Sequence, residues 1–290
     1  MSTVVTGATG HLGRLVVEAL LRRGVEPSEI VATGRDIGKI KDLADRGVTV
    51  RRADFTDSDS LTAAFAGAEK LLLVSTDALG SRTDGHRRAI DVARAAGVTT
   101  LAYTSITKAD SARMTLATEH RETEQYLQAG GAPFVILRNS WYLENYTGQL
   151  ATYLEHGSVL GSAGQGLVSA ATRADYAEAA AVVLTTEGHQ GTVYELGGDQ
   201  PFTLSDLAAA LSAATGREIS YTDLPAPAYA EVLTGAGVPQ GFAEVLADAD
   251  LGLARGELRT DSGDLRRLLG RPTTTLAAAI SAALAAQPTA

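Results

Sequence analysis

Cysteine is absent from the 290 residues of this chain, and no apolar run approaches the ~20 residues of a membrane-spanning helix. The lack of thiols excludes disulfide bonds, a thiol nucleophile and a zinc site built from cysteines. It also fits a reducing compartment. The first strand is expected to begin almost at the first residue, which leaves no room for a signal peptide. We therefore expect a cytoplasmic protein without a membrane partner.

Basic residues are the minority among the charged residues. The chain has 25 lysines and arginines against 34 aspartates and glutamates, for a net charge of -9. Because binding a nucleic acid backbone needs basic stripes, we expect no nucleic acid partner. The histidines and carboxylates form no cluster that predicts a metal site. The chain also lacks the Gly-x-Ser-x-Gly turn of a large class of hydrolases.

Residues 1–14, MSTVVTGATGHLGR, read as a strand, a glycine turn and the start of a helix, which is the context of a dinucleotide-binding fingerprint. There, one glycine permits the tight turn, one lets a pyrophosphate approach the backbone, and one lets the helix pack closely on the strand. The N–H groups of the first helical turn then face an anion. The predicted cofactor contacts in this loop are Gly7, Thr9, Gly10, His11, Leu12 and Gly13. The alternatives are a glycine turn without a ligand and, for His11, contact with solvent only.

A second cofactor signal follows the next predicted strand, residues 29–33. In many dehydrogenases an acidic residue at this point binds the adenosine ribose, but here the strand is followed by Gly34 and Arg35, with Lys39 one turn further on. A cation at this point suits a 2′-phosphate through a charge-assisted hydrogen bond. The sequence therefore favours NADP(H) over NAD(H). The alternative is that Arg35 is a solvated loop residue and Asp36 only an N-cap.

Strands and helices alternate regularly as far as residue 138. Residues 70–75 are apolar on both faces, as in a central parallel strand. With right-handed crossovers, the alternation predicts an α/β fold with a doubly wound parallel sheet, the Rossmann fold. Further strands are predicted at 48–52, 99–105 and 133–138, and helices at 37–44, 58–65 (with a cap at Ser58-Asp59), 84–96 and 114–129.

The carboxyl ends of these strands carry polar residues, and ligands bind such sheets at that edge. Asp54 is expected to accept from the adenine amino group, with Phe55 lining the ring, unless Asp54 or Thr56 only begins the next loop. Two further pairs follow the next strands. Ser75 and Thr76 are expected beside the nicotinamide ribose, and Thr104 and Ser105 where a reductase holds its substrate carbonyl. Thr104 is also expected to contact the cofactor.

The alternation breaks beyond residue 138. Helices are expected at 141–154, 173–184, 203–215 and 273–285, with two or three more between 225 and 253; strands are expected at 192–196 and 219–222, and 158–166 is rich in turn residues. Residues 1–155 are therefore expected to form the NADP(H)-binding domain, with 170–198 packing back onto it. Residues 156–290 are expected to form a smaller α+β substrate-binding domain.

Several motifs together give a family resemblance. The segments TGATGHLG, Gly34-Arg35, Ala53-Asp54-Phe55, LLLVST and LRNSWYLEN resemble the NmrA-like branch of atypical short-chain dehydrogenase/reductases. Within that branch, the YTSI strand, the acidic helix pattern of residues 119–124 and the YELGGDQPFTLSDLA segment are most similar to the short-chain-type NADPH:quinone oxidoreductases. The likeness covers nearly the whole chain. The branch also holds redox-sensing regulators that bind the dinucleotide without turnover, and biosynthetic tailoring enzymes.

The resemblance also shows a departure. Ordinary short-chain reductases carry Tyr-x-x-x-Lys on the helix after the fifth strand, but here the Tyr position falls on Leu116 and the Lys position on His120. Quinone reduction tolerates this loss, because the product oxyanion is a stabilised phenolate for which positioning and a few hydrogen bonds suffice.

The substrate-side candidates are Thr104, Ser105, His120, Asn139 and Tyr142. By resemblance, His120 holds the nicotinamide ribose or lies near the carboxamide; its alternative is a surface histidine beside Glu124. Trp141 and Tyr142 are equally expected as packing residues, and Asp175 as a helix cap. The remaining histidines outside the glycine loop are expected at the surface: His86, His156 and His189.

The function expected from these observations is an NADPH-dependent oxidoreductase. Hydride would pass directly, without a flavin, to a quinone-like or conjugated carbonyl substrate. The alternatives are an NADP(H)-binding redox sensor without turnover and a biosynthetic enzyme on the same fold. A monomer and a homodimer are both compatible with the sequence.

Overall fold

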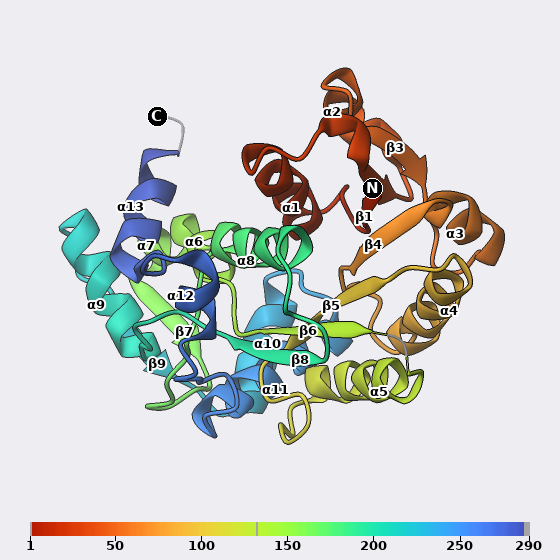
Figure 1. Ribbon diagram of the computed structural model, residues 1–290. Helices are drawn as coiled ribbons and strands as arrows, with labels where there is room; N and C mark the ends of the chain where they lie inside the picture. The colour runs from red at the N-terminus through yellow and green to blue at the C-terminus, as the bar shows by residue number, and fades with distance from the viewer. Residues whose placement is uncertain (1, 132, 287–290) are drawn as a thin grey trace. The chain divides into compact units, whose positions relative to one another are not determined.

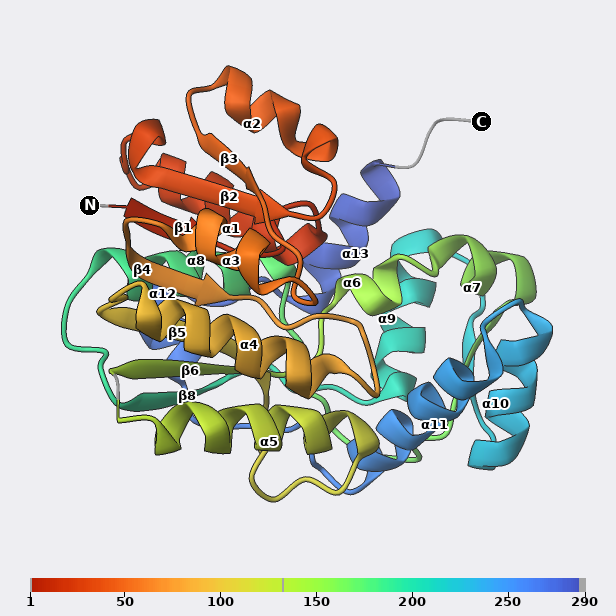
Figure 2. The same ribbon diagram turned by 90° about the vertical axis from the view of Figure 1, so that its right-hand side faces the viewer.

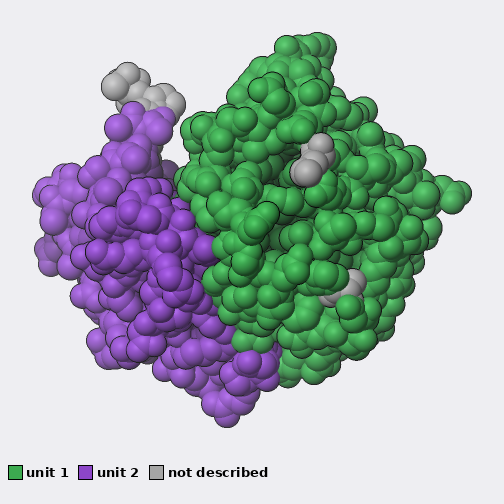
Figure 3. Space-filling view, in the orientation of Figure 1, with its two compact units in different colours: residues 1–106, 119–139, 173–194 green, residues 107–118, 140–172, 195–290 purple. Residues whose placement is uncertain are grey.

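The computed structural model describes residues 2–131 and 133–286. The chain forms two compact units, which Figure 3 colours separately. Unit 1 contains residues 1–106, 119–139 and 173–194, and unit 2 contains residues 107–118, 140–172 and 195–290. The chain thus leaves unit 1 and returns to it twice. The domain boundary at residue 155 remains a prediction.

A seven-stranded sheet organises unit 1, with the strand order β3-β2-β1-β4-β5-β6-β8. The strands β1 to β3 follow one another toward one edge of the sheet, and the strands from β4 onward follow one another toward the other edge. The strand order therefore reverses between β1 and β4 (Figure 1). The neighbouring strands from β3 to β6 all pair in parallel. This arrangement confirms the predicted doubly wound parallel sheet. The strands are β1 (Ser2–Val5), β2 (Ile30–Gly34), β3 (Thr49–Arg52), β4 (Ala68–Leu73), β5 (Thr100–Ile106), β6 (Phe134–Asn139) and β8 (Thr192–Leu196).

Helices cover both faces of this sheet (Figures 1 and 2). On one face, α1 (His11–Arg22) packs against α8 (Arg173–Thr185). The other face carries α3 (Ser58–Phe65), α4 (Arg82–Ala95) and α5 (Thr115–Ala129). Alternate strand residues point to opposite faces. On the face of α3 to α5 they form one apolar core with helix residues, which includes Leu71, Leu73, Tyr103, Phe65 and Ile90.

Two helix starts in unit 1 differ from the predictions. Residues 37–44 do not form one helix: a 3-10 turn, Ile37–Ile40, precedes the short helix α2, Lys41–Asp45. Asp36 caps the turn by accepting from the N–H of Gly38. The predicted cap of α3 at Ser58-Asp59 is wrong, because Asp57 accepts from the N–H groups of Asp59 and Ser60 and so satisfies the first turn.

Unit 2 combines short helices with a two-stranded parallel sheet. Its strands are β7 (Ser158–Gly161) and β9 (Ser220–Asp223). The helix expected at 203–215 is confirmed as α9, where Thr203 and Asp206 form a capping box at its start. The helices are α6 (Glu144–Thr147), α7 (Leu150–His156), α9 (Leu204–Thr215), α10 (Ala226–Gly235), α11 (Gln240–Ala254), α12 (Asp264–Leu269) and α13 (Leu276–Ala285).

The structure of unit 2 differs from what the sequence indicates at three points. The helix expected at 141–154 is divided into α6 and α7, because Gly148 ends the first helix and Gln149 leaves helical geometry with φ -104. The turn-rich segment 158–166 contains β7, which gains its hydrogen bonds from β9, a strand distant in sequence. Helix α12 was not expected; Gly263 and Gly270, both with positive φ, bound it.

In the part of the chain that the structure describes, no helix combines the length and apolarity needed to cross a bilayer.

Candidate cofactor and substrate site

The glycine loop between β1 and α1 has the geometry of an anion-binding turn. Gly7 has φ 63, in the left-handed region that favours glycine. A Cβ on Gly13 would lie 2.4 Å from the carbonyl oxygen of Gly7, so only glycine fits there. Gly10 is the N-cap of α1 and has no side chain to occupy the first N–H groups of the helix. These groups, with the positive end of the helix dipole, are available to a phosphate.

Contacts at the strand ends hold this loop in place. Ala8 donates to the carbonyl oxygen of Thr33 over 2.8 Å, and the Thr9 side chain lies so close to Gly34 that a Cβ there would be 2.5 Å from Thr9 Cγ2. On the other side, Val74 N donates to Thr6 Oγ1 over 2.9 Å. The loop is therefore fixed between the carboxyl ends of β2 and β4, where a dinucleotide crosses the sheet.

Arg35 and Lys39 lie at the surface after β2, the strand that neighbours β1 on the side away from β4. Neither side chain has an ion-pair partner among residues 2–131 and 133–286. An exposed, unpaired guanidinium at this point fits a 2′-phosphate. The geometry equally permits the solvated-loop alternative for Arg35, so its role stays a prediction, and Asp36 does act as the cap described above.

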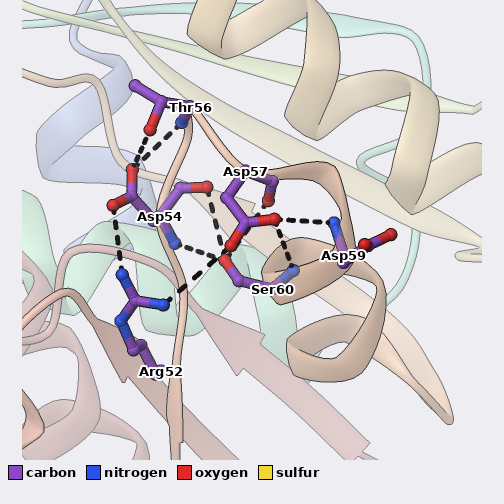
Figure 4. Close-up of polar contacts among 6 residues, drawn as sticks. All are labelled: Arg52, Asp54, Thr56, Asp57, Asp59 and Ser60. Carbon is purple, nitrogen blue, oxygen red and sulfur yellow. Dashed lines mark hydrogen bonds and ion pairs between the residues drawn. The ribbon is translucent and has the colours of Figure 1, made fainter.

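Asp54 holds the turn after β3, as Figure 4 shows. Its Oδ1 accepts from the N–H and hydroxyl of Thr56, over 3.0 and 2.8 Å, and its Oδ2 lies 3.4 Å from Arg52 Nη2. The Thr56 hydrogen bonds lower the pKa of the Asp54 carboxyl, so it is charged at neutral pH. The turn-forming alternative is thus realised, and the adenine contact remains a prediction. Phe55 packs edge-on against the ring of His86, with 6.1 Å between centroids.

The ends of β4 and β5 meet at Ser75, Thr76 and Thr104. The buried hydroxyl oxygen of Thr104 accepts from Ser75 N over 2.9 Å and lies 3.3 Å from the Ser75 hydroxyl. Thr76 N donates to Nε2 of His86 over 3.2 Å. The structure therefore brings together the residues that the sequence assigns to the nicotinamide half of the cofactor.

Ser105 takes part in a buried ion pair that sequence reasoning missed. Its hydroxyl donates to Glu124 Oε1 over 2.5 Å, and Arg138 donates to both Glu124 oxygens over 3.0 and 2.6 Å. All three side chains are buried. The contact fastens β5, α5 and β6 together. A charged residue at the end of an otherwise apolar strand was the available signal for Arg138.

His120 is buried, so its alternative as a surface histidine beside Glu124 is wrong. Its Nε2 lies 2.8 Å from Arg82 Nη1 and its Nδ1 lies 2.7 Å from the hydroxyl of Tyr103. An arginine only donates, so Nε2 is the bare acceptor and Nδ1 carries the proton. Burial, helped by the charge of Arg82, holds the pKa of His120 well below its usual value.

The surface position predicted for His86 is also wrong, because this residue is fully buried. Its Nε2 accepts from Thr76 N and its Nδ1 lies 3.1 Å from the hydroxyl of Thr123. Burial, with a smaller effect of Arg82, lowers the pKa of His86 to about 3. His156 is exposed as predicted, whereas His189 is half-buried against Tyr194.

The remaining candidates come from different segments of the chain. Asn139 is the buried last residue of β6, in register with Ile106. Tyr142 is half-buried and forms an isolated bridge with Ala171. Asp175 is buried in the first turn of α8, where its role as a cap was predicted. Leu116, in the first turn of α5, occupies the position where an ordinary reductase has its tyrosine.

The helix α1 has no side-chain cap, follows a tight glycine turn and lies where the strand order of the parallel sheet reverses. These three features together define a dinucleotide-binding protein. The cradle at Gly10 and the unpaired Arg35 fit NADP(H). A sequence model of the family described as NAD(P)H-binding matches residues 7–187. The chain therefore belongs to the NAD(P)H-binding family, which confirms the predicted nicotinamide cofactor.

Related proteins are similar to this chain over almost its whole length. Quinone oxidoreductase 2 of Escherichia coli (strain K12) is 47% identical over 277 residues, which cover 96% of both chains. The crystal structure of NADPH-dependent quinone oxidoreductase QOR2 from the same species, complexed with NADPH, matches with a TM-score of 0.94 at 46% identity, covering 98% of this chain and 100% of that one. The triphenylmethane reductase of Citrobacter sp., complexed with NADP(H), matches with a TM-score of 0.93 at 36% identity and the same coverage. The predicted resemblance is confirmed.

Proposed function

We propose that the protein is an NADPH-dependent oxidoreductase that transfers hydride directly to a quinone. The observation that carries the proposal is the 47% identity to Quinone oxidoreductase 2 over 96% of both chains. The glycine cradle supports it on the cofactor side, and the unpaired Arg35 supports NADPH over NADH.

Bound NADPH supplies the hydride, and the protein positions both partners. The N–H groups at the start of α1 would hold the pyrophosphate, and Arg35 with Lys39 the 2′-phosphate. Thr104 and Ser75, tied to each other at the strand ends, would line the nicotinamide half. We propose Asn139 and Tyr142 as hydrogen-bond donors to the substrate. Thr104, Ser105 and His120 remain proposed site residues, although the hydroxyl of Ser105 and both ring nitrogens of His120 already have protein partners.

The absence of a tyrosine acid at Leu116 fits a quinone better than a simple ketone. A quinone yields a stabilised phenolate, so proton donation in the transition state is less important than for an alkoxide. Conjugated carbonyl acceptors share this property, and isolated ketones do not.

The test is steady-state turnover of the purified protein with NADPH or NADH, against a panel of quinones and matched saturated ketones. We expect quinone-dependent loss of nicotinamide absorbance, faster at low cofactor concentration with NADPH than with NADH, and no turnover of the ketones. Tight NADPH binding without turnover of any quinone would overturn the proposal.

One observation favours a second function, a redox sensor that binds NADP(H) without turning it over. No general acid stands at Leu116, and His120 is held neutral between Arg82 and Tyr103. For a sensor, binding would distinguish the oxidised from the reduced dinucleotide, and added quinone would leave bound NADPH unchanged.

A further inference from the structure

Arg82, the first residue of α4, carries a buried positive charge without a matching negative one. The residue is 5% exposed. Its Nη1 lies 2.8 Å from His120 Nε2, and its Nε is fully buried and has no hydrogen-bond partner. In the described chain, no carboxylate oxygen lies within 4.0 Å of this guanidinium. A buried charge in this condition is costly unless a ligand pairs with it.

The imidazole that Arg82 contacts does not balance its charge. His120 accepts the hydrogen bond at Nε2 and donates from Nδ1 to the Tyr103 hydroxyl, so the ring is neutral. The second histidine of this region, His86, uses Nε2 to accept from Thr76 N and is neutral for the same reason. The hydroxyl of Tyr103 is fully buried and carries no negative charge at neutral pH.

The carboxylates of α5 that face α4 are engaged elsewhere. Glu119 accepts from the main-chain N–H groups of Gly80 and Arg82, and Glu122 accepts from the Thr83 hydroxyl. Glu124 is paired with Arg138. Glu119 therefore neutralises the start of α4, where the helix dipole is itself positive and disfavours a cation.

Arg94, near the other end of α4, shows how the same helix stabilises an arginine. Its Nε is also buried without a partner. Its Nη2, however, donates to the carbonyl oxygens of Tyr126 and Leu127 at the negative end of α5, and its Nη1 lies 3.6 Å from Asp91. The protein thus compensates the positive charge of Arg94, but it does not compensate that of Arg82.

The position of Arg82 indicates which ligand atom it meets. It follows the loop from β4, and it reaches β5 through His120 and Tyr103, so it belongs to the β4–β5 side of the sheet. The phosphate sites at the glycine loop and Arg35 follow β1 and β2, and β1 lies between β2 and β4. The cofactor phosphates are therefore on the other side, and the substrate is the remaining source of an anion.

We propose that Arg82 binds the oxygen of the substrate that becomes negative during hydride transfer, and that His120 positions its guanidinium. This inference rests on the proposed quinone reduction. The C4–H bond of the dihydronicotinamide breaks and its electron pair goes with the hydrogen to the quinone. NADPH is oxidised to NADP⁺, and the quinone is reduced to a hydroquinone monoanion, which then takes one proton from water. Arg82 stabilises this monoanion and the transition state that leads to it.

Two variants and one matched control test the kinetic role. Arg82→Met keeps the apolar stem and removes the charge, whereas Arg82→Lys keeps the charge. With quinone as acceptor, kcat should fall on the order of 10²-fold in Arg82→Met and be partly restored in Arg82→Lys. The dissociation constant for NADPH should stay within about twofold. Arg94→Met, on the same helix, should keep the wild-type kcat even if its melting temperature falls.

A binding measurement tests the same role without turnover. With NADP⁺ bound, titration with 2-hydroxy-1,4-naphthoquinone, an anion at neutral pH, should be about tenfold or more weaker in Arg82→Met than in wild type. Titration with the neutral 1,4-naphthoquinone should differ little between the two.

The outcomes separate the two proposals. A wild-type protein inactive on every quinone overturns the proposed function, and the anion titration still decides whether Arg82 binds a negative oxygen. Equal anion affinity in wild type and Arg82→Met, or an active wild type with unchanged kcat in Arg82→Met, overturns the inference. If Arg82→Met lost as much affinity for NADPH as for the anionic quinone, Arg82 would belong to the cofactor site, and this result also contradicts the inference.

Discussion

Gly13 in the first turn of α1 packs directly on the carbonyl group of Gly7, leaving 2.4 Å between the position of a Cβ and that oxygen. Gly10, three residues earlier, would place its Cβ 3.4 Å from the same atom. The two glycines are therefore needed for different reasons. Gly13 allows α1 to pack on the turn, and Gly10 leaves room for a ligand beside the turn.

Substitution of these glycines should separate folding from binding. In Gly13→Ala the new methyl group meets the backbone of Thr6 and Gly7, so we expect about 2–3 kcal/mol of lost stability and no cofactor binding. In Gly10→Val we expect less than about 1 kcal/mol of lost stability, with loss of both NADPH and NADH binding. Urea unfolding without ligand and fluorescence titration with each cofactor measure the two effects. Gly235→Ala, with no atom near the new Cβ, is the control. Normal NADPH binding by Gly10→Val would mean that the loop is used differently.

Removal of the Arg35 guanidinium should change the choice of cofactor. Arg35→Ala loses a charged hydrogen bond to the 2′-phosphate, so we expect NADPH binding to weaken by about 1–3 kcal/mol and NADH binding to change little. Arg46→Ala, which removes an arginine already paired with Glu18 at 2.7 Å, should leave both affinities unchanged. Equal weakening of NADPH and NADH in Arg35→Ala would show that the residue does not recognise the phosphate.

His86 should make the folded protein sensitive to acid. Burial lowers its pKa to about 3 in the folded state, so below pH ~6.5 His86 binds a proton in the unfolded chain but not in the folded protein. The contribution of His86 to the free energy of unfolding is therefore fully present above pH ~6.5 and is lost as the pH falls toward 3. For this one group the loss from pH 7 to pH 5 is about 2 kcal/mol. Urea unfolding at both pH values should show a smaller loss in His86→Gln than in wild type. An equal loss in both proteins would assign the acid sensitivity to other groups.

The Ser105 hydroxyl should matter for stability through Glu124. Ser105→Ala removes a donor from the buried ion pair, so we expect about 1–3 kcal/mol of lost stability. Glu124→Gln removes the negative charge that pairs with the buried guanidinium of Arg138, and we expect a larger loss of about 3–5 kcal/mol. Urea unfolding measures both variants, and steady-state turnover runs in parallel. A drop in kcat of Ser105→Ala at unchanged stability would instead show that its hydroxyl serves the substrate.

The fold was predictable because its signals are local. Each apolar strand of the first half ends in polar residues and is followed by a helix, and that alternation alone implies parallel strands with their ligand edge at Thr9, Asp54, Ser75 and Thr104. The positions of the glycine loop and of Arg35 in the fold were predictable for the same reason, since a fixed distance along the chain separates them from the strand that they follow.

The burial of the two histidines was not predictable in this way. His120 and Arg82 are 38 residues apart, and hydrophobic periodicity says which face of a helix is buried but not which polar partner it meets there. The helix expected from 84 onward began at Arg82 instead, so the sequence placed this arginine in a loop. The pairing of Glu124 with Arg138 was missed because it depends on the contact between α5 and the end of β6.

The most direct test of the account is a single turnover followed in a rapid-mixing instrument. The purified protein is saturated with NADPH, or with NADPH carrying deuterium at the transferred position, and is mixed with excess 1,4-benzoquinone in the absence of any flavin. Direct hydride transfer predicts one fast loss of the bound nicotinamide absorbance, faster than that of free NADPH with the same quinone and slowed by deuterium. Bound NADPH that reacts no faster than free NADPH would contradict the account and leave a protein that only senses its cofactor.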